Sequence, residues 1–190
     1  MKKILCILLL LLTGCSSKTS MIEIQKHVYV EKEFKDSWLE TNEFGDSYIK
    51  EELQGGYHYH FDQQFLEIFF NTSGKIELYN YSIKKNDLII SGEMIPPKTI
   101  RLVHPHLDNV TSEGVIIHEL GHYFDEKHQF SSSKQFTELY KKYRTLFNQK
   151  TKKEYFAECF KEYVGGHQEK VKPFHSYMKT ITQKIRQKNK

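Results

Sequence analysis

The chain has 190 residues, and its 28 lysine and arginine residues against 24 aspartate and glutamate residues give a formal net charge of +4. This balance does not suggest a nucleic-acid-binding protein, because such proteins carry a pronounced basic surface. Two of the three cysteines, Cys6 and Cys15, lie within or beside an apolar N-terminal segment, so Cys159 alone cannot form an intramolecular disulfide or a cysteine metal cluster.

The first fourteen residues have the pattern of a targeting segment. Two lysines precede an apolar run over residues 4–12, which is too short to cross a membrane as a stable helix. The segment ends in Leu-Thr-Gly-Cys at residues 12–15, which resembles the lipobox of bacterial lipoproteins. The resemblance implies cleavage before Cys15, lipidation of its thiol and anchoring at the outer face of the membrane. An ordinary signal peptide with an incidental cysteine is the alternative, and it would release the protein to the extracellular region.

The rest of the chain divides into a short tether and one domain. Residues 16–26 are polar, so we expect a lipidated tether over residues 15–27. Residues 28–190 are long enough for a single domain with a hydrophobic core. Without residues 1–14 the chain keeps 26 basic and 24 acidic residues, and this balance again gives no indication of nucleic-acid binding.

Short elements are predicted in the first half of the domain. Residues 34–48 could hold one or two short helices, and residues 57–60 are expected to form a polar loop. Residues 61–70 have apolar side chains at helical spacing and end before Gly74, so they predict a buried helix. Strand patterns then follow at residues 75–80, 87–91 and 99–103.

Helices dominate the second half of the domain. The predicted helices span residues 112–127 with Thr111 or Ser112 as the N-cap, residues from the serine cluster at 131–133 to about Phe147, residues 154–164, and residues from Pro173 to the C-terminus. Strands followed by helices favour an α+β fold. We therefore expect a small mixed sheet with an N-terminal helix, followed by a helical half that carries the candidate site.

The strongest chemical signal is the sequence His-Glu-Leu-Gly-His at residues 118–122. On a helix, His118 and His122 lie one turn apart on the same face, so their imidazoles can bind one small cation, and zinc suits this pair. Glu119 projects beside such a metal, where it can take a proton from a metal-bound water. Asp125 lies on the histidine face and could orient an imidazole by a hydrogen bond.

The residues around this motif argue against an accidental match on a surface helix. Gly121 is a poor helix former, so its place within a helix indicates the close approach of another backbone. The side opposite the histidines is apolar and is expected to face the core; it consists of Ile116, Ile117, Leu120, Tyr123 and Phe124.

A second pair of candidate residues follows at Glu154 and Glu158. They are also one helical turn apart, and apolar residues again lie opposite them. Two histidines leave a catalytic zinc one protein ligand short. One of the two carboxylates would bind the metal, and the other would accept a hydrogen bond from a ligand histidine. The alternative is a solvated acidic face with Lys161 as an ion-pair partner.

Together, the two motifs resemble the protease domain of anthrax toxin lethal factor and the related secreted Pro-Pro endopeptidases of clostridia and bacilli. The resemblance covers roughly residues 60–165. It implies zinc ligands at His118, His122 and Glu154. It also implies that Glu119 is the catalytic base and that Glu158 supports a ligand histidine.

The chain departs from this family at one position. Relatives carry a tyrosine seven residues before the ligand glutamate, and its hydroxyl assists the oxyanion, whereas this chain has Phe147 there. Tyr143, one helical turn earlier, is the expected substitute, and Tyr140 is a poorer one. If neither reaches the site, the loss of one oxyanion donor can lower the rate on the order of 10²–10³-fold.

The leading hypothesis is a zinc-dependent endopeptidase at the outer face of the bacterial membrane, which hydrolyses peptide bonds of extracellular or surface proteins. Its cofactor would be Zn²⁺, and its partners would be a protein or peptide substrate and the membrane, through the lipid anchor. We expect a monomer. The strand at residues 99–103 precedes the motif helix and is expected to be the sheet edge with which an extended peptide pairs.

Two other hypotheses follow from the same residues. A zinc-binding surface lipoprotein without catalysis would act as a binding module; Phe147 favours it, whereas Glu119 argues against it because a structural zinc site needs no base. A surface interaction protein without a metal would leave Glu154 and Glu158 solvated.

Overall fold

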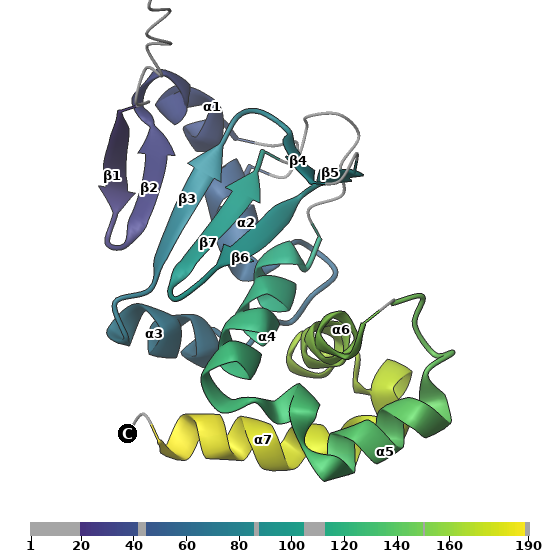
Figure 1. Cartoon of the computed structure of the whole chain (residues 1–190). Coiled ribbons are helices and arrows are strands. Elements are labelled where there is room, and N and C mark those ends of the chain that lie inside the picture. Colours follow the sequence, from purple (N-terminus) through teal and green to yellow (C-terminus); the bar gives the residue numbers. More distant parts are fainter. Residues whose placement is uncertain (1–19, 42–44, 86–87, 105–112, 150, 189–190) are drawn as a thin grey trace, which may run out of the picture.

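The computed structural model describes residues 20–41, 45–85, 88–104, 113–149 and 151–188 (Figure 1). The predicted targeting segment with the lipidation site Cys15 lies outside these ranges, as do the predicted helix caps Thr111 and Ser112. Within the described ranges, no helix combines the length and the apolar character that a membrane span requires.

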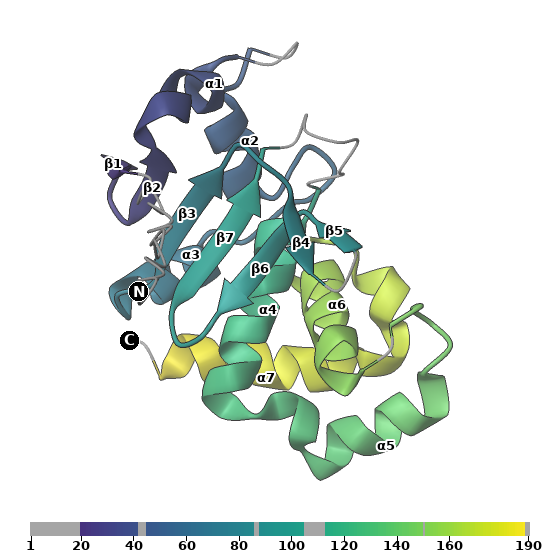
Figure 2. The same cartoon turned by 45° about the horizontal axis from the view of Figure 1, so that its top comes forward.

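The predicted α+β fold is confirmed: a five-stranded mixed sheet lies beside a helical half (Figure 1). The strand order is β1-β2-β3-β7-β6, in which β2, β3 and β7 run parallel and the two outer strands run antiparallel to their neighbours. The sheet strands are β1 (Met21–Gln25), β2 (Val28–Glu31), β3 (Lys75–Tyr79), β6 (Gly92–Ile95) and β7 (Thr99–Val103). Two further strands, β4 (Ile83–Lys85) and β5 (Leu88–Ile90), pair with each other beside β6 (Figures 1 and 2).

Two strands of the sheet differ from the sequence-based expectation. β1 lies within the region predicted as a tether, so the ordered fold begins before residue 28. Its pattern is weak because an edge strand has one neighbour and this strand is only partly buried. The strand at residues 99–103 is predicted at the sheet edge, but β7 is internal. The chain turns at residues 96–98 and pairs β6 with β7, so β6 occupies the edge.

The helices fall into two groups along the chain. The N-terminal helices are η1 (Lys32–Phe34), α1 (Lys35–Leu39), α2 (Tyr48–Gln54) and α3 (Gln64–Asn71). The C-terminal half contains α4 (Val115–His128), η2 (Phe130–Ser132), α5 (Lys134–Tyr143), α6 (Lys152–Val164), η3 (Gln168–Phe174) and α7 (His175–Gln187). α5 starts as predicted, because Ser133 Oγ accepts a hydrogen bond from the Phe136 amide at 3.2 Å, but the helix ends four residues before Phe147.

Helix α4 lies between the sheet and α6, and it carries the histidine motif into the middle of the molecule (Figure 1). The ring of Phe124 on α4 lies 5.9 Å from that of Phe65 on α3 and 5.6 Å from that of Phe160 on α6, between ring centroids, and the rings of Phe65 and Phe160 lie 5.4 Å apart. Burial of one such ring contributes about 1.5–3 kcal/mol. The face predicted to be apolar is buried, with exposed fractions of 3 % or less at Ile116, Ile117, Leu120, Tyr123 and Phe124.

Gly121 allows α4 and α6 to approach each other closely. A Cβ atom added at Gly121 would lie 2.9 Å from Ala157 Cα and 3.3 Å from Ala157 Cβ. The predicted close approach of another backbone is therefore confirmed. It places the histidine face of α4 beside the first turns of α6.

Candidate metal centre

Two helices bring three candidate ligands together. His118 and His122 lie on α4, and Glu154 lies in the first turn of α6. The Nε2 atoms of the two histidines are 3.3 Å and 3.2 Å from Glu154 Oε2. One ligand atom from each of the three residues lies within 4.8 Å of the others. These three residues can hold a metal ion.

The local fold fixes Glu154 at this point. Thr151 caps α6, since its Oγ1 accepts a hydrogen bond from the Glu154 amide at 3.2 Å. The carboxylate therefore projects from the first turn of α6, where the helix dipole also favours a negative charge. Hydrogen bonds with His118 and His122 hold the pKa of Glu154 well below its usual range.

Glu158 contacts the other side of the first histidine. Its Oε2 lies 3.2 Å from His118 Nδ1, and its Oε1 lies 2.6 Å from Lys161 Nζ. Burial would raise the pKa of the Glu158 carboxyl, but the hydrogen bonds from His118 and Lys161 bring it below its usual value. The geometry therefore distinguishes the two acids: Glu154 faces both Nε2 atoms and is the candidate ligand, whereas Glu158 faces Nδ1 of His118.

The acids around the histidines favour a positive charge between them. Burial alone would lower the pKa of His118, but hydrogen bonds with Glu154 and Glu158 raise it to about 9. The same carboxylates that stabilise a proton on an imidazole would stabilise a metal cation in its place. The negative charges around the histidines therefore favour a bound cation, as the donor atoms of His118, His122 and Glu154 do.

Glu119 lines a cleft beside the two histidines and is 6 % exposed. Burial raises the pKa of its carboxyl, while His118, His122 and a hydrogen bond from the Met94 backbone act in the opposite direction. Met94 belongs to the edge strand β6, so this contact ties the predicted base to the wall of the cleft.

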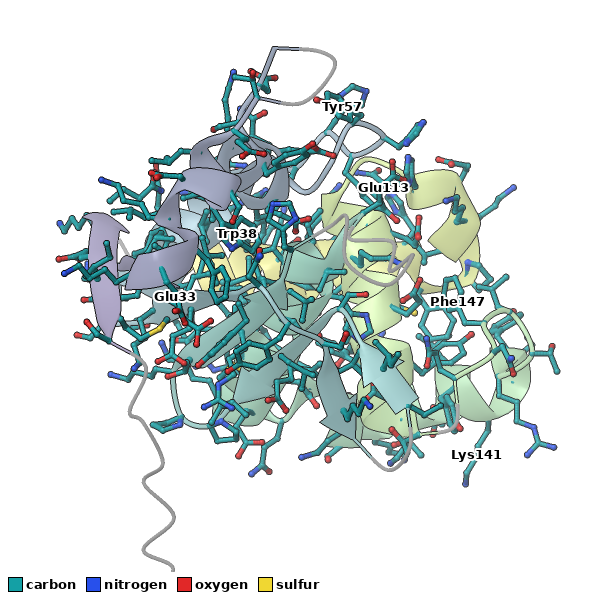
Figure 3. The ribbon with its side chains drawn as sticks, turned by 90° about the horizontal axis from the view of Figure 1, so that it is seen from above. Glu33, Trp38, Tyr57, Glu113, Lys141 and Phe147 are labelled. Atoms are coloured by element: carbon teal, nitrogen blue, oxygen red, sulfur yellow. The ribbon has the colours of Figure 1, made fainter. Side chains whose placement is uncertain are left out.

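The cleft consists of two pockets that share lining residues. A part of about 540 Å³ lies over the two histidines, between β6 and the start of α6. A part of about 340 Å³ adjoins it at His118 and Glu119 and continues toward Glu113 and Lys161. Glu113, which is labelled in Figure 3, lines this second part, and its carboxylate contacts the imidazole of His58. The wall of the first part combines apolar residues of β5 and β6 with polar residues of the helical half; they include Leu88, Ile90, Met94, Glu126, Gln149 and Lys153.

Asp125 has a different role from the one predicted. Its Oδ1 accepts a hydrogen bond from the Ser131 amide at 2.6 Å, and its Oδ2 accepts one from the Ser131 hydroxyl at 2.6 Å. Both carboxylate oxygens thus bind the turn after α4, so the prediction that Asp125 orients an imidazole is corrected. The i+3 spacing from His122 predicts the helix face on which Asp125 lies. The chain turns after α4, however, and brings the Ser131 amide and hydroxyl to its carboxylate.

The predicted oxyanion donor Tyr143 lies away from the cleft. Its ring packs on Phe174 with centroids 6.1 Å apart, and its carbonyl accepts a hydrogen bond from the Tyr155 hydroxyl at 2.6 Å. Tyr140 and Phe147 both pack against the ring of Tyr155 instead. Among the residues that the structure describes, neither part of the cleft is lined by a tyrosine. The prediction for Tyr143 is corrected because α5 ends there and its inner face packs on the helical core.

The sequence pattern missed several groups of the site. The residues of β5 and β6 that line the cleft have no chemical signature, because their role depends on the order of strands in the sheet. The sequence suggests Lys161 only as the partner of a solvated acidic face, although its i+3 spacing from Glu158 is visible in the sequence. Its side chain is 16 % exposed, so it is enclosed rather than solvated.

Comparisons with known proteins give a distant structural link. No protein-family model matches the chain, and no curated protein does. Among solved structures, the chain is similar to the Pro-Pro endopeptidase PPEP-2 from Paenibacillus alvei, with a TM-score of 0.50 and 15 % sequence identity over 63 % of this chain and 84 % of that one. At this level of identity, the similarity concerns the fold. This comparison therefore supports the fold that the resemblance of the two motifs implies.

Proposed function

We propose that the chain is a zinc-dependent endopeptidase. The observation that carries this proposal is the spacing of the ligand atoms around Glu154 Oε2, at 3.2 Å and 3.3 Å from the histidine nitrogens. Two ligand atoms bound tetrahedrally at zinc distances lie about 3.3 Å apart. Two imidazoles and one carboxylate also form a common ligand set of catalytic zinc sites, which leave a fourth position open. The residues present therefore fit zinc.

The residues around the site support peptide hydrolysis. A bound zinc ion would supply Lewis-acid chemistry, polarising a peptide carbonyl and acidifying a water molecule. Glu119, buried beside the ligands, takes a proton from the attacking water and passes it to the leaving amine. Glu158 accepts the hydrogen bond from His118 Nδ1 and holds the ring so that Nε2 faces the ligand cluster.

The substrate strand is proposed to pair with β6 rather than with β7. β6 forms the edge of the sheet, and its residues Gly92 and Met94 line the cleft over Glu119. An extended peptide can add to such an edge through main-chain hydrogen bonds. Leu88 and Ile90 line the same cleft, so apolar side chains of a substrate would contact them.

The place of action is proposed from the sequence alone. The Leu-Thr-Gly-Cys sequence at residues 12–15 supports lipidation at Cys15 and an enzyme held at the outer face of the membrane. Proteins at the cell surface or outside the cell would then be its substrates, and the enzyme would act as a monomer.

A metal-binding module without catalysis is the second candidate. The position of Tyr143 favours it, because this side chain packs on Phe174 and would not reach an oxyanion in the cleft. The buried Glu119 beside the ligands favours the enzyme, since a purely structural metal site has no use for a base at that point.

Zinc content and cleavage of a mixed peptide library, measured for the wild type and for Glu119→Gln, test the proposal. We expect one equivalent of zinc in both proteins and cleavage by the wild type alone. Glu138→Gln, the same chemical change at an exposed position of α5, is the matched control and should cleave as the wild type does. Zinc binding without cleavage by the wild type would support the binding module. Absence of zinc binding would refute both candidates.

A further inference from the structure

We propose that Lys161 is a positioning residue of the metal centre: it holds Glu158 in the orientation that accepts the hydrogen bond from His118, and the buried carboxylate of Glu162 holds Lys161. The inference rests on the metal site of the proposed function and adds a residue that neither the motifs nor the comparisons assign.

The three side chains form a chain of alternating charges on one helix. Lys161 Nζ lies 2.6 Å from Glu158 Oε1 and 3.6 Å from Glu162 Oε1. The other oxygen of Glu158 faces His118 Nδ1 at 3.2 Å. One carboxylate thus uses one oxygen for the lysine and the other for the histidine.

The three charged side chains are largely buried, so each of them needs a partner of opposite charge. The side chains of Lys161, Glu158 and Glu162 are 16 %, 14 % and 5 % exposed, respectively. Two buried carboxylates one helical turn apart repel each other unless a cation lies between them. Without Lys161, Glu158 would face Glu162 with one oxygen unpaired, and it would turn toward solvent or take up a proton. Either change weakens its hydrogen bond with His118.

Glu162 is itself held by residues of the loop before α3 and of the segment that follows α6. Its Oε1 accepts a hydrogen bond from the Tyr59 hydroxyl at 3.1 Å, and its Oε2 lies 3.0 Å from His167 Nδ1 and 3.0 Å from Lys170 Nζ. Lys161 Nζ also lies 5.9 Å from the centre of the Tyr59 ring, within the range of a cation–π contact. The ammonium group is therefore surrounded by Glu158, Glu162 and Tyr59, which define its position.

The contacts of the Lys161 ammonium group indicate that it acts through Glu158. It lines the second part of the cleft, but its charge is used by the two carboxylates. Its proposed effect on the reaction passes through Glu158 and the orientation of His118.

The test compares the zinc affinity of metal-binding variants by competition with a chelator. We expect Lys161→Met to weaken zinc binding by about 10–100-fold, the usual effect of losing a group that supports a metal ligand. Lys161→Arg keeps a cation between the carboxylates and should stay within a few-fold of the wild type. Lys152→Met is the matched control, because Lys152 lies on the same helix but binds the Thr137 hydroxyl at 3.1 Å.

A double-mutant cycle separates this role from general stabilisation. If Lys161 acts through Glu158, Lys161→Met should have little further effect on zinc affinity in the Glu158→Gln background. Additive losses, or wild-type affinity in Lys161→Met, would overturn the proposal. If Lys161→Met does not fold, Glu162→Gln removes the anchor and should weaken zinc binding in the same direction.

The affinity measurement does not require a substrate. A wild type that binds zinc but cleaves no peptide would refute the proposed endopeptidase and leave the effect of Lys161 measurable. A wild type that binds no zinc would refute both proposals. Where cleavage is observed, kcat should fall in Lys161→Met and KM should stay nearly unchanged.

Discussion

Glu158 Oε2 lies 3.2 Å from His118 Nδ1, on the side of the ring opposite to the nitrogen that faces the ligand cluster. A hydrogen bond at this place fixes both the tautomer and the orientation of a ligand imidazole. Each helix therefore contributes a pair of residues one turn apart. Glu154 contacts the Nε2 atoms of both histidines, and Glu158 contacts Nδ1 of His118.

Glu158→Gln should weaken metal binding without abolishing it. The amide keeps the shape of the side chain but loses the negative charge that the imidazole N–H contacts, and such losses typically cost about 10–100-fold in metal affinity. Glu154→Gln should have a larger effect, because it removes a ligand. Competition with a chelator measures both. Equal affinities of Glu158→Gln and the wild type would show that this hydrogen bond does not support the site.

Tyr143→Phe should leave peptide cleavage unchanged. The ring of Tyr143 packs on Phe174, so its hydroxyl does not line the cleft. Phenylalanine at this position preserves the packing. Tyr143→Ala removes the half-buried ring and should lower the free energy of unfolding by about 0.5–3 kcal/mol, the usual range of a destabilising substitution. Steady-state kinetics and urea unfolding measure the two effects. A large loss of kcat in Tyr143→Phe alone would restore this residue as an oxyanion donor.

The candidate ligands could be predicted because they depend on local spacing. His118 and His122, like Glu154 and Glu158, share a helix face whatever the rest of the fold is, so two short patterns define the centre. The apolar face of α4 was predictable for the same reason. The α+β class followed from the order of strand and helix patterns along the chain.

The walls of the cleft could not be predicted, because they depend on tertiary structure. Strand β6 has four residues and a weak pattern, and only its pairing with β7 places it at the edge. For Asp125, helix geometry predicts the face on which the side chain lies but not the group that it binds. The prediction for Tyr143 rests on its distance along the chain from Glu154, whereas the end of α5 decides where its ring packs.

Gly121→Ala should destabilise the protein, although alanine is the better helix former by about 1 kcal/mol. The added Cβ would lie 2.9 Å from Ala157 Cα, so α4 and α6 would have to move apart, at a typical cost of about 1–3 kcal/mol. Urea unfolding of the metal-free protein measures the change. Ala157→Gly in the same background should not restore stability, because the nearest atom is a backbone Cα. An increase in stability would mean that the helices are not in close contact.

The last prediction concerns the edge strand that borders the cleft. Arg101 of β7 lies between two acids: its Nε is 3.3 Å from Glu77 Oε2 on β3, and its Nη1 is 3.3 Å from Glu93 Oε1 on β6. Glu77 also accepts hydrogen bonds from Lys75 Nζ at 2.6 Å and from the Tyr79 hydroxyl at 2.8 Å. These side chains connect three neighbouring strands, so the position of β6 depends partly on the charge of Glu77.

Stability should therefore depend on pH through Glu77. Burial would raise the pKa of its carboxyl, but the hydrogen bonds from Lys75 and Tyr79 and the charge of Lys75 lower it below the ordinary value of 4.5. A carboxyl whose pKa is lower in the folded state stabilises the fold above the unfolded pKa, and this contribution disappears as the pH falls through the folded pKa. The difference in unfolding free energy between the wild type and Glu77→Gln should thus be largest near neutral pH and shrink in acid. Lys75→Met, which removes the first of these hydrogen-bond donors, should weaken this pH dependence. A difference that stays constant with pH, or that grows in acid, would mean that the charge of Glu77 does not hold these strands together.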